Sequence, residues 1–452
     1  MRRFVLPMVL LLNACVPVTP GDTPTRALPQ ISDLPPMKTF GAPRPAVPIR
    51  SNNDLALDFI ELSFQLESGR ELPVFTRFEG PISVQVTGAP PASLGPDLRR
   101  LMHRLRTEAG IDIDAATPGS TPNITIEAVS RAQIRRALPH AACFVVPNIT
   151  TISEYKPNRR SARTSWTNLR TRKQLAIFLP NDASPQEVRD CLHEELAQAI
   201  GPLNDLYRLP DSVFNDDNVH TVLTGFDMMM LRAYYAPELR SGMTRGEVAQ
   251  RLPAIFGRIN PRGDQLPAKY ATRTPRAWSQ AVQTALGPGA TQPARRAAAD
   301  RALKIAQAMG WKDHRRAFAH YANGRLLLST DPKAAQTHFR AADQYYAATQ
   351  GADLHRAYVA TQLAAYAITR GDGDAAIVLL SPHIDEAALN ENAALLSTLL
   401  LLRAEALDLQ GRSAEARTVR LDSLGWARYG FGPDWAVRAK LREISSLNPL
   451  NG

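Results

Sequence analysis

The stretch SPQEVRDCLHEELAQAIGPLND, residues 184–205, decides the fold of the middle of the chain. Ser184 has a side chain that caps helix N-termini, Pro185 suits a first helical turn, and Glu187 stands where it can complete a capping box. The Gly-Pro pair at 201–202 stops a helix. The stretch therefore predicts a helix that opens at Ser184 and runs to about residue 200.

Segments on either side of this helix predict a sheet and further helices. Residues 82–86 alternate apolar and polar side chains as a half-buried strand does, and three other segments also predict strands (124–129, 142–146 and 174–179). Residues 54–67 carry apolar side chains at helical spacing, and residues 97–108 predict another helix. We therefore predict an α+β domain over residues 51–258.

The polar residues of the central helix have a more specific spacing. His193 and Glu194 suggest the zinc-binding motif HExxH, but the residue four after His193 is Ala197, so a second ligand is missing. Shifted by one residue, the segment has the spacing of the metzincin pattern HExxHxxGxxH followed by Asp, at Glu194, Glu195, Gln198, Gly201, Asn204 and Asp205. It resembles a metzincin active-site helix with all three histidines replaced.

Downstream residues extend this resemblance. Phe214, in the stretch 211–215, falls where metzincins have their methionine turn, and Asp227 stands near the start of a segment (226–235) that resembles their carboxy-terminal helix. The chain looks most similar to a family of uncharacterised secreted bacterial proteins that carry the variant EExxQxxGxxND. The resemblance implies a metzincin-like α+β fold for residues 51–258.

The replaced ligand positions limit the chemistry. Glu194, Gln198 and Asn204 offer only oxygen atoms and one formal charge, a set that binds zinc more weakly than imidazole or thiolate does. We therefore expect no cofactor, or at most a weakly bound divalent metal, and no ordinary peptidase activity. Three alternatives stay open: a buried hydrogen-bond network, a cleft that binds peptide or glycan without cleaving it, and a metal-dependent hydrolase of peptide or cell-wall substrates with Glu195 as general base.

The amino terminus predicts export. Two arginines precede an apolar run (residues 4–12) that is too short to span a bilayer, which takes about 20 residues. The ending Leu-Asn-Ala-Cys at 12–15 resembles the bacterial lipobox, which implies a signal peptide over residues 1–14 and a diacylglyceryl group on Cys15 that anchors the chain in a lipid bilayer. The alternative is an ordinary cleaved signal with a chance cysteine. Val16 in place of Asp favours the outer membrane, so we expect a lipid-anchored envelope protein that faces the periplasm.

The remaining two cysteines and the charge agree with that compartment. Cys143 and Cys191 form an even pair, which predicts a disulfide in an oxidising environment; two buried free thiols are the alternative. The formal net charge is +10, but the basic residues are scattered apart from a cluster at 159–173. A nucleic-acid partner is not expected.

The rest of the chain predicts a tether, a linker and a helical domain. Residues 15–50 are rich in proline and predict a tether, and residues 259–290 a linker. Residues 291–447 predict successive helices at 294–309, 315–328, 332–348, 352–370 and 392–409. Small and aromatic residues at helix-pair positions, recurring about 40 residues apart, resemble tetratricopeptide repeats (Gly324, Ala335, Phe339, Ala342, Ala376 and Ala416). Such repeats imply a protein or peptide partner; an ordinary helical bundle is the alternative.

Overall fold

The computed structural model describes residues 32–41, 43 and 45–451. The sheet and all the described helices belong to one compact unit, Leu34–Gly452. The predicted signal peptide (1–14) and lipidation site Cys15 lie outside the described residues. Within the described part of the chain, no helix combines the length and apolarity needed to cross a membrane.

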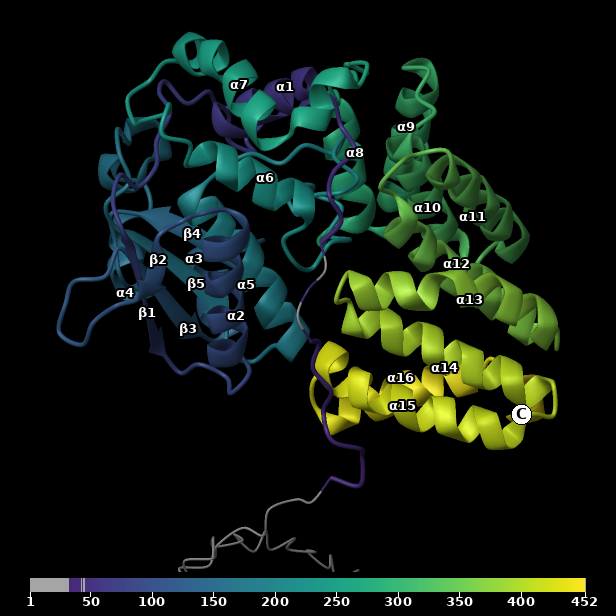
Figure 1. The fold of residues 1–452 in the computed structure, drawn as a ribbon. Coiled ribbons are helices and arrows are strands. Elements are labelled where there is room, and N and C mark those ends of the chain that lie inside the picture. The colour runs from purple at the N-terminus through teal and green to yellow at the C-terminus, as the bar shows by residue number, and fades with distance from the viewer. Residues whose placement is uncertain (1–31, 42, 44, 452) are drawn as a thin grey trace, which may run out of the picture. The chain divides into compact units, whose positions relative to one another are not determined.

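A five-stranded sheet forms the centre of the α/β region (Figure 1). Its strands run in the order β2-β1-β3-β5-β4, with bounds Ile113–Ala115, Ile82–Gly88, Ile124–Val129, Leu175–Pro180 and Phe144–Pro147. Neighbouring strands are parallel except β4, which pairs antiparallel with β5 at one edge. The four predicted strands are confirmed. Because strands alternate with helices and the sheet is mostly parallel, the region is an α/β fold rather than the predicted α+β fold.

Helices cover both faces of this sheet. In β5, Leu175, Ile177 and Leu179 belong to the main core, while Ala176 and Phe178 point into a second core on the opposite face. The main core includes side chains of α2 (Leu94–Glu108) and α5 (Pro185–Ile200), and the second includes those of α3 (Arg131–Ala137) and α4 (Ile152–Asn158). Burial on both faces explains why β5 is apolar throughout.

Three further helices complete the main core: α1 (Asn52–Ser63), α6 (Gly225–Tyr234) and α7 (Arg245–Ile259). The helix predicted at 54–67 is confirmed but ends earlier. Beyond Ser63 the chain turns back on itself, since the Leu66 amide donates to the Arg70 carbonyl and the Leu72 amide to the Phe64 carbonyl. These bonds take backbone groups that a longer helix would need, so Glu67 lies outside the helix.

The second half of the predicted tether is packed on the folded unit. The Lys38 amide donates to the Gly425 carbonyl (3.0 Å), and Phe40 stacks on Trp426 with ring centroids 4.5 Å apart. Arg50 forms ion pairs with Asp58 (2.8 Å) and Asp211 (2.6 Å). Ordered packing therefore begins well before residue 51, because aromatic and arginine side chains supply contacts that a high proline content does not reveal.

The carboxy-terminal half is helical. Its helices are α8 (Arg276–Leu286), α9 (Gln292–Ala308), α10 (His314–Leu327), α11 (Pro332–Ala347), α12 (Asp353–Thr369), α13 (Gly373–Leu389), α14 (Ala393–Leu409), α15 (Ser413–Phe431) and α16 (Asp434–Ser445). Short 3-10 turns occur in the α/β region at Ala162–Thr164 and Trp166–Asn168, and elsewhere at Pro261–Gln265 and Pro449–Asn451. The predicted helices are confirmed, and α8 lies inside the range predicted as a linker.

Successive helices of this half pack against one another as pairs. Ala335, Ala376 and Ala416 occupy matching places in α11, α13 and α15, and all three are fully buried. Gly324 lets α10 approach α11, since a Cβ there would lie 2.7 Å from the Phe339 ring. The helical repetition that the small residues indicated is therefore present.

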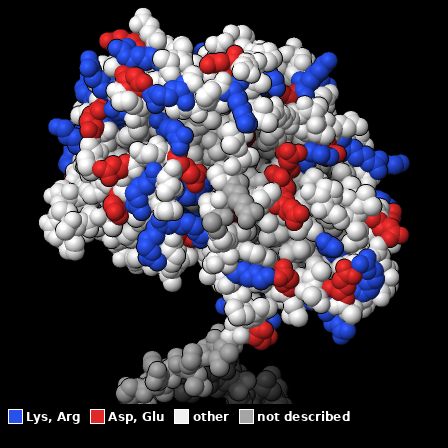
Figure 2. Space-filling model, in the orientation of Figure 1, with Lys and Arg blue, Asp and Glu red and all other residues white. Residues whose placement is uncertain are grey.

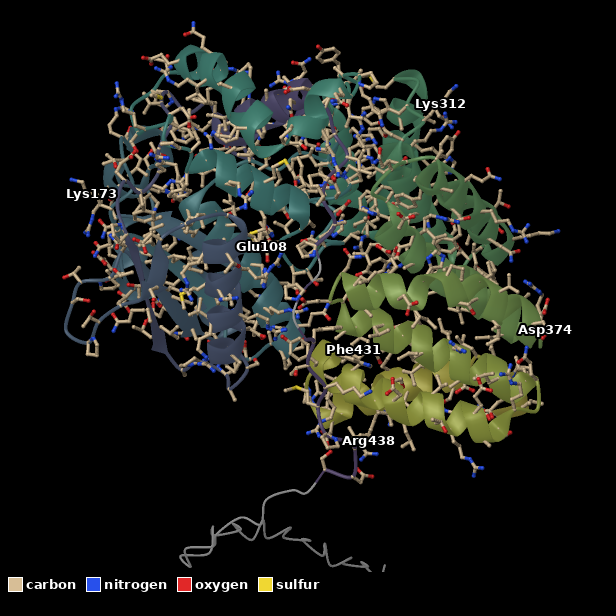
Figure 3. The ribbon with its side chains drawn as sticks, viewed as in Figure 1. Glu108, Lys173, Lys312, Asp374, Phe431 and Arg438 are labelled. Carbon is tan, nitrogen blue, oxygen red and sulfur yellow. A yellow bond between two sulfur atoms is a disulfide. The ribbon has the colours of Figure 1, made fainter. Side chains whose placement is uncertain are left out.

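Charged side chains of both signs are interspersed over the surface in Figure 2. Lys173, at the end of the basic cluster at 159–173, lies at the outer edge of the α/β region, far from the helical pairs (Figure 3). Asp374, at the start of α13, lies at the opposite outer end.

Candidate functional site

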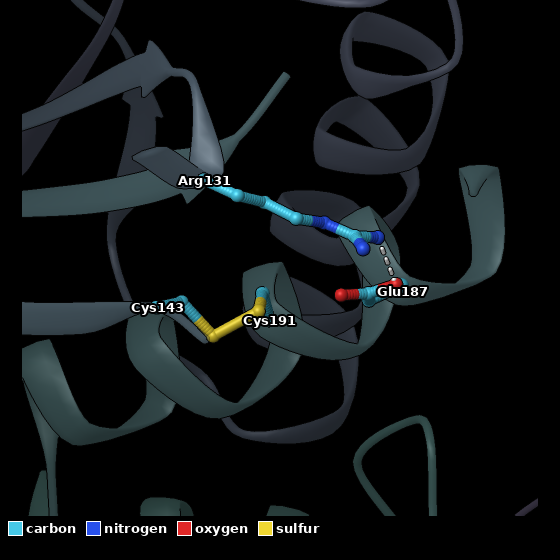
Figure 4. The surroundings of a disulfide bond; sticks show 4 residues. All are labelled: Arg131, Cys143, Glu187 and Cys191. Atoms are coloured by element: carbon cyan, nitrogen blue, oxygen red, sulfur yellow. Dashed lines mark hydrogen bonds and ion pairs between the residues drawn. A yellow bond between two sulfur atoms is a disulfide. The ribbon is translucent and has the colours of Figure 1, made fainter. Parts of the chain in front are cut away.

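The motif helix α5 is fixed at its start by a cap and a disulfide. The Ser184 hydroxyl accepts a hydrogen bond from the Glu187 amide, as predicted. The capping box is not completed, because the Glu187 carboxylate pairs with Arg131 instead (2.5 Å; Figure 4). The predicted disulfide is confirmed: Cys191 on α5 is bonded to Cys143, which directly precedes the edge strand β4 (Figure 4).

The end of α5 makes the sharp turn that the motif glycine indicated. A Cβ on Gly201 would lie 2.5 Å from the Leu231 side chain, so glycine allows α6 to pack directly against this turn. Arg172 donates to the carbonyls of Gln198 (2.7 Å), Ala199 (2.8 Å) and Gly201 (2.5 Å). This buried arginine satisfies the carbonyls left free at the helix end, and no local sequence signal identified it.

Asp227 joins the turn containing Phe214 to the start of α6. Its carboxylate accepts from the Ser212 hydroxyl (2.5 Å) and from the amides of Val213 (3.2 Å) and Thr224 (2.7 Å). Phe214 is fully buried in the main core. Burial raises the pKa of Asp227 to about 6, although its hydrogen bonds act in the opposite direction. Asp227 thus ties the loop that holds Phe214 to the start of α6.

Two of the three ligand positions are engaged in separate hydrogen bonds. The Gln198 amide donates to the Glu67 carboxylate (3.2 Å), whereas the Asn204 amide donates to the backbone carbonyl of Glu61 on α1 (2.9 Å). Their side chains thus serve different partners.

The third ligand position is Glu194, whose carboxylate interacts with other acidic groups. We call the five residues of this group the acidic cluster: Glu67, Glu194, Glu195, Asp205 and Asp216. Burial, together with the charges of Glu67 and Asp216, raises the pKa of Glu194 to about 7. The pKa values of Glu195 and Asp205 are raised well above normal, again chiefly by burial and then by neighbouring carboxylates. Glu67 and Asp216 lie outside the motif, and only the tertiary fold brings them to it.

Glu195, at the base position, is 5% exposed, and its Oε2 has no hydrogen-bond partner among the described residues. Asp205 Oδ1 also has no hydrogen-bond partner among the described residues. Both oxygens are buried, and neither residue lines either of the two cavities described below.

The donor set does not fit the metal centre of a zinc peptidase. No three His, Cys, Asp or Glu side chains in the described part of the chain are arranged to hold a metal ion. His193 is occupied by the Leu223 amide, which donates to its Nδ1 (3.1 Å), and burial holds its pKa well below normal. His220 Nε2 bonds to the Pro210 carbonyl (2.9 Å).

The acidic face of α5 lies near the helical half. Asp190 lies one turn before Glu194 on α5. The pKa of Tyr358 on α12 is raised by burial and by the charges of Tyr321, Asp190 and Asp217, so Asp190 lies close to α12. Arg189 pairs with Glu391 (3.0 Å), and Gln186 donates to Asn392 (3.1 Å), just before α14. The motif helix is therefore part of the contact between the two halves.

Two cavities lie near these elements. The larger, about 710 Å³, is lined by residues of the 43–51 segment, the 208–226 loop and neighbouring helices, but by none of the acidic cluster. The smaller, about 250 Å³, lies beside Asp217, the neighbour of Asp216.

The fold and site together define an α/β protein with an acidic motif helix, joined to a series of helical pairs. Residues 52–254 match the model of a family described as a protein of unknown function (DUF2927). This range holds the sheet, the motif and most of α7, and agrees with the prediction of an uncharacterised family. No curated protein and no solved structure matches the chain.

Proposed function

We propose that this chain is an envelope lipoprotein whose metzincin-like region has lost catalysis and whose tetratricopeptide-like helices bind a protein or peptide partner. Residues 1–14 would direct export, and acylated Cys15 would hold the protein in the bilayer, facing the periplasm and most simply in the outer membrane. The repeats would present the binding surface, as stacked helix pairs generally do.

One observation carries the non-catalytic part of this proposal. Gln198 and Asn204, at two ligand positions, donate to Glu67 and to the Glu61 carbonyl, so these positions stabilise the fold. The two amides donate to partners at different places, Glu67 and α1, which supports a structural role for each of them. The close packing of α6 on Gly201 supports the retained peptidase-like scaffold.

The scaffold can be tested by restoring the histidines. We expect full-length wild-type protein, purified in detergent without chelator, to hold much less than one equivalent of zinc and not to hydrolyse casein or peptidoglycan. The triple variant Glu194→His, Gln198→His, Asn204→His is expected to bind about one zinc, because three imidazoles at this spacing form a catalytic-type site. The double variant Glu194→His, Gln198→His is the control and should bind zinc less tightly. Stoichiometric zinc and hydrolysis in the wild type would overturn the proposal.

A second candidate is a metal-dependent hydrolase with Glu195 as general base. The observation that favours it is the buried, unpartnered Oε2 of Glu195, since enzymes often keep a carboxyl with a raised pKa for proton transfer. Here Glu195→Gln would abolish hydrolysis, while Glu187→Gln on the same helix would not. Without any hydrolysis to abolish, this candidate fails.

A further inference from the structure

The amino-terminal segment meets the folded unit at its last two helices, α15 and α16. Leu34 packs in one apolar cluster with Val437 of α16. Arg428 of α15 donates a hydrogen bond to the Pro35 carbonyl (2.9 Å), which also holds the segment in place. In Figure 1 this segment, coloured purple, runs beside α15 and α16. The chain therefore enters the folded unit at the end of the helical pairs.

The outer face of α16 carries a tryptophan. Four residues at helical spacing share this face, and we call them the Trp435 stripe: Trp435, Arg438, Ala439 and Arg442. Trp435 is 73% exposed, whereas the four other tryptophans of the chain are buried or half-buried. The last helix of a repeat array normally presents a polar face to water. Here a large aromatic ring beside two arginines takes that place.

This combination of side chains favours the surface of an anionic bilayer. Tryptophan prefers the boundary between headgroups and acyl chains, because its ring is apolar while its N–H is polar. Arginine is attracted to anionic headgroups. The two carboxylates of α16 are paired, Asp434 with Arg428 (3.9 Å) and Glu443 with Lys440 (2.8 Å). Neither therefore leaves an uncompensated negative charge beside the stripe.

The place of the predicted anchor also supports a bilayer as the surface that covers the stripe. Leu34 follows Cys15 by 19 residues, so even a fully extended chain would keep Leu34 within about 65 Å of an acylated Cys15. Along the chain, this end of the folded unit is the nearest to the anchor. A tether of limited length gives even a weak second contact a high effective concentration.

We propose that the Trp435 stripe docks on the anionic bilayer in which Cys15 is anchored, with the indole among the headgroups and the arginines beside lipid phosphates. This inference rests on the proposed function in one respect, namely that Cys15 is acylated. By itself, so small a surface binds weakly and reversibly. The acyl chains would hold the protein, and the stripe would decide which end of the helical pairs faces the bilayer.

The test uses the full-length protein in vesicles of phosphatidylethanolamine and phosphatidylglycerol whose acyl chains are brominated, because bromine quenches only tryptophans that lie at the bilayer. We expect the lipid to quench the wild type and to quench Trp435→Phe about threefold less or weaker still, since the tryptophan at the interface is gone. Trp166→Phe is the matched control, because half-buried Trp166 lies in the α/β region. Its quenching should equal that of the wild type.

The charge of the stripe is tested separately. Arg442→Gln should weaken docking about fivefold, so that the same quenching needs a larger share of phosphatidylglycerol. Arg340→Gln is the matched control, since Arg340 is exposed on α11, away from the stripe. Equal responses of the two variants would overturn the role of the arginines. Should Trp435→Phe unfold, as shown by circular dichroism, this comparison still decides the matter.

Other outcomes separate this inference from the proposed function. An acylated protein that floats with the vesicles, but whose quenching is the same in the wild type and in Trp435→Phe, would overturn the docking and leave a lipoprotein. A protein without acyl chains would overturn the anchor; quenching of Trp435 by excess vesicles would then still support the stripe, and its absence would overturn both. A dimer in detergent that Trp435→Ala abolishes, without quenching by lipid, would assign the stripe to a second copy of the chain instead.

Discussion

At the scale of single residues, Glu194 gives the clearest prediction. Its pKa is raised to about 7 by burial and by Glu67 and Asp216, whereas a glutamate in an unfolded chain titrates at about 4.3. Between these values the folded state holds a proton that the unfolded state has lost. The contribution of Glu194 to stability should therefore fall as the pH rises from about 4.5 to 7 and then level off.

Glu194→Gln removes this contribution, while Glu195 and Asp205, whose pKa values are also raised, leave a pH dependence of their own. We expect its free energy of unfolding to exceed that of the wild type by on the order of 2 kcal/mol at pH 8, with little difference at pH 4.5. Urea denaturation at the two pH values measures the effect. Glu187→Gln, which removes a partly exposed carboxylate paired with Arg131, is the control on the same helix. A Glu194→Gln variant with the same pH dependence as the wild type would contradict the buried acidic cluster.

At the scale of elements, the disulfide between Cys143 and Cys191 links α5 to the start of β4. The two cysteines are 48 residues apart, and closing a loop of that length contributes roughly 3–4 kcal/mol. The double variant Cys143→Ser, Cys191→Ser should lose about this much stability in chemical denaturation. Reductant should lower the wild type to the same level and leave the double variant unchanged; insensitivity of the wild type would argue against the bond.

One contact position between the two helices of a pair is filled by different residues in three successive pairs. Gly324 meets Phe339 in the first pair, Ala365 and Leu380 stand at the same positions in the next, and the third pair holds Glu405 and Arg420, which form an ion pair (2.9 Å). In the first two pairs a small residue on one helix lies opposite a larger residue on the other, and in the third an ion pair takes this place.

This interpretation predicts coupling between the two positions of the first pair. Gly324→Ala should lower stability by about 1–2 kcal/mol, because the new methyl group would overlap the Phe339 ring. Combined with Phe339→Leu, which copies the second pair, the loss should be smaller than the sum of the two single changes by about 1 kcal/mol or more. Thermal denaturation of the four proteins in this cycle measures it, and additive effects would count against the shared position.

At the scale of the whole molecule, the proposed lipid anchor on Cys15 can be tested. If the proposed acylation is what holds the chain at the bilayer, Cys15→Ala should move it from the membrane fraction to the soluble fraction, because the acyl chains are lost. Fractionation and the intact mass of the protein report the two effects. The disulfide double variant is the matched control, since it also loses cysteines yet should remain in the membrane. Unchanged membrane association of Cys15→Ala would remove the lipoprotein assignment.

The sequence by itself determined many of the elements and part of the local chemistry of this protein, although β2, α3, α4 and α8 were not predicted. Helix α5, its Ser184 cap and its Gly201 stop follow from side chains within a few residues of one another, and the strands and helical pairs follow from apolar periodicity. Cys143 and Cys191 could be paired because no other cysteine follows the predicted lipidation site. Such features depend on short-range geometry, which a linear pattern records.

The tertiary structure alone decided which distant groups meet. Glu67 and Asp216 complete the acidic cluster, Arg172 caps the end of α5, and the Asp217–His355 pair joins a loop of the α/β region to α12. Likewise, Phe40 and Arg50 hold a proline-rich segment against the folded unit. Charges and polar groups interact according to their distance in space and their burial, and the number of residues between two groups in the sequence determines neither.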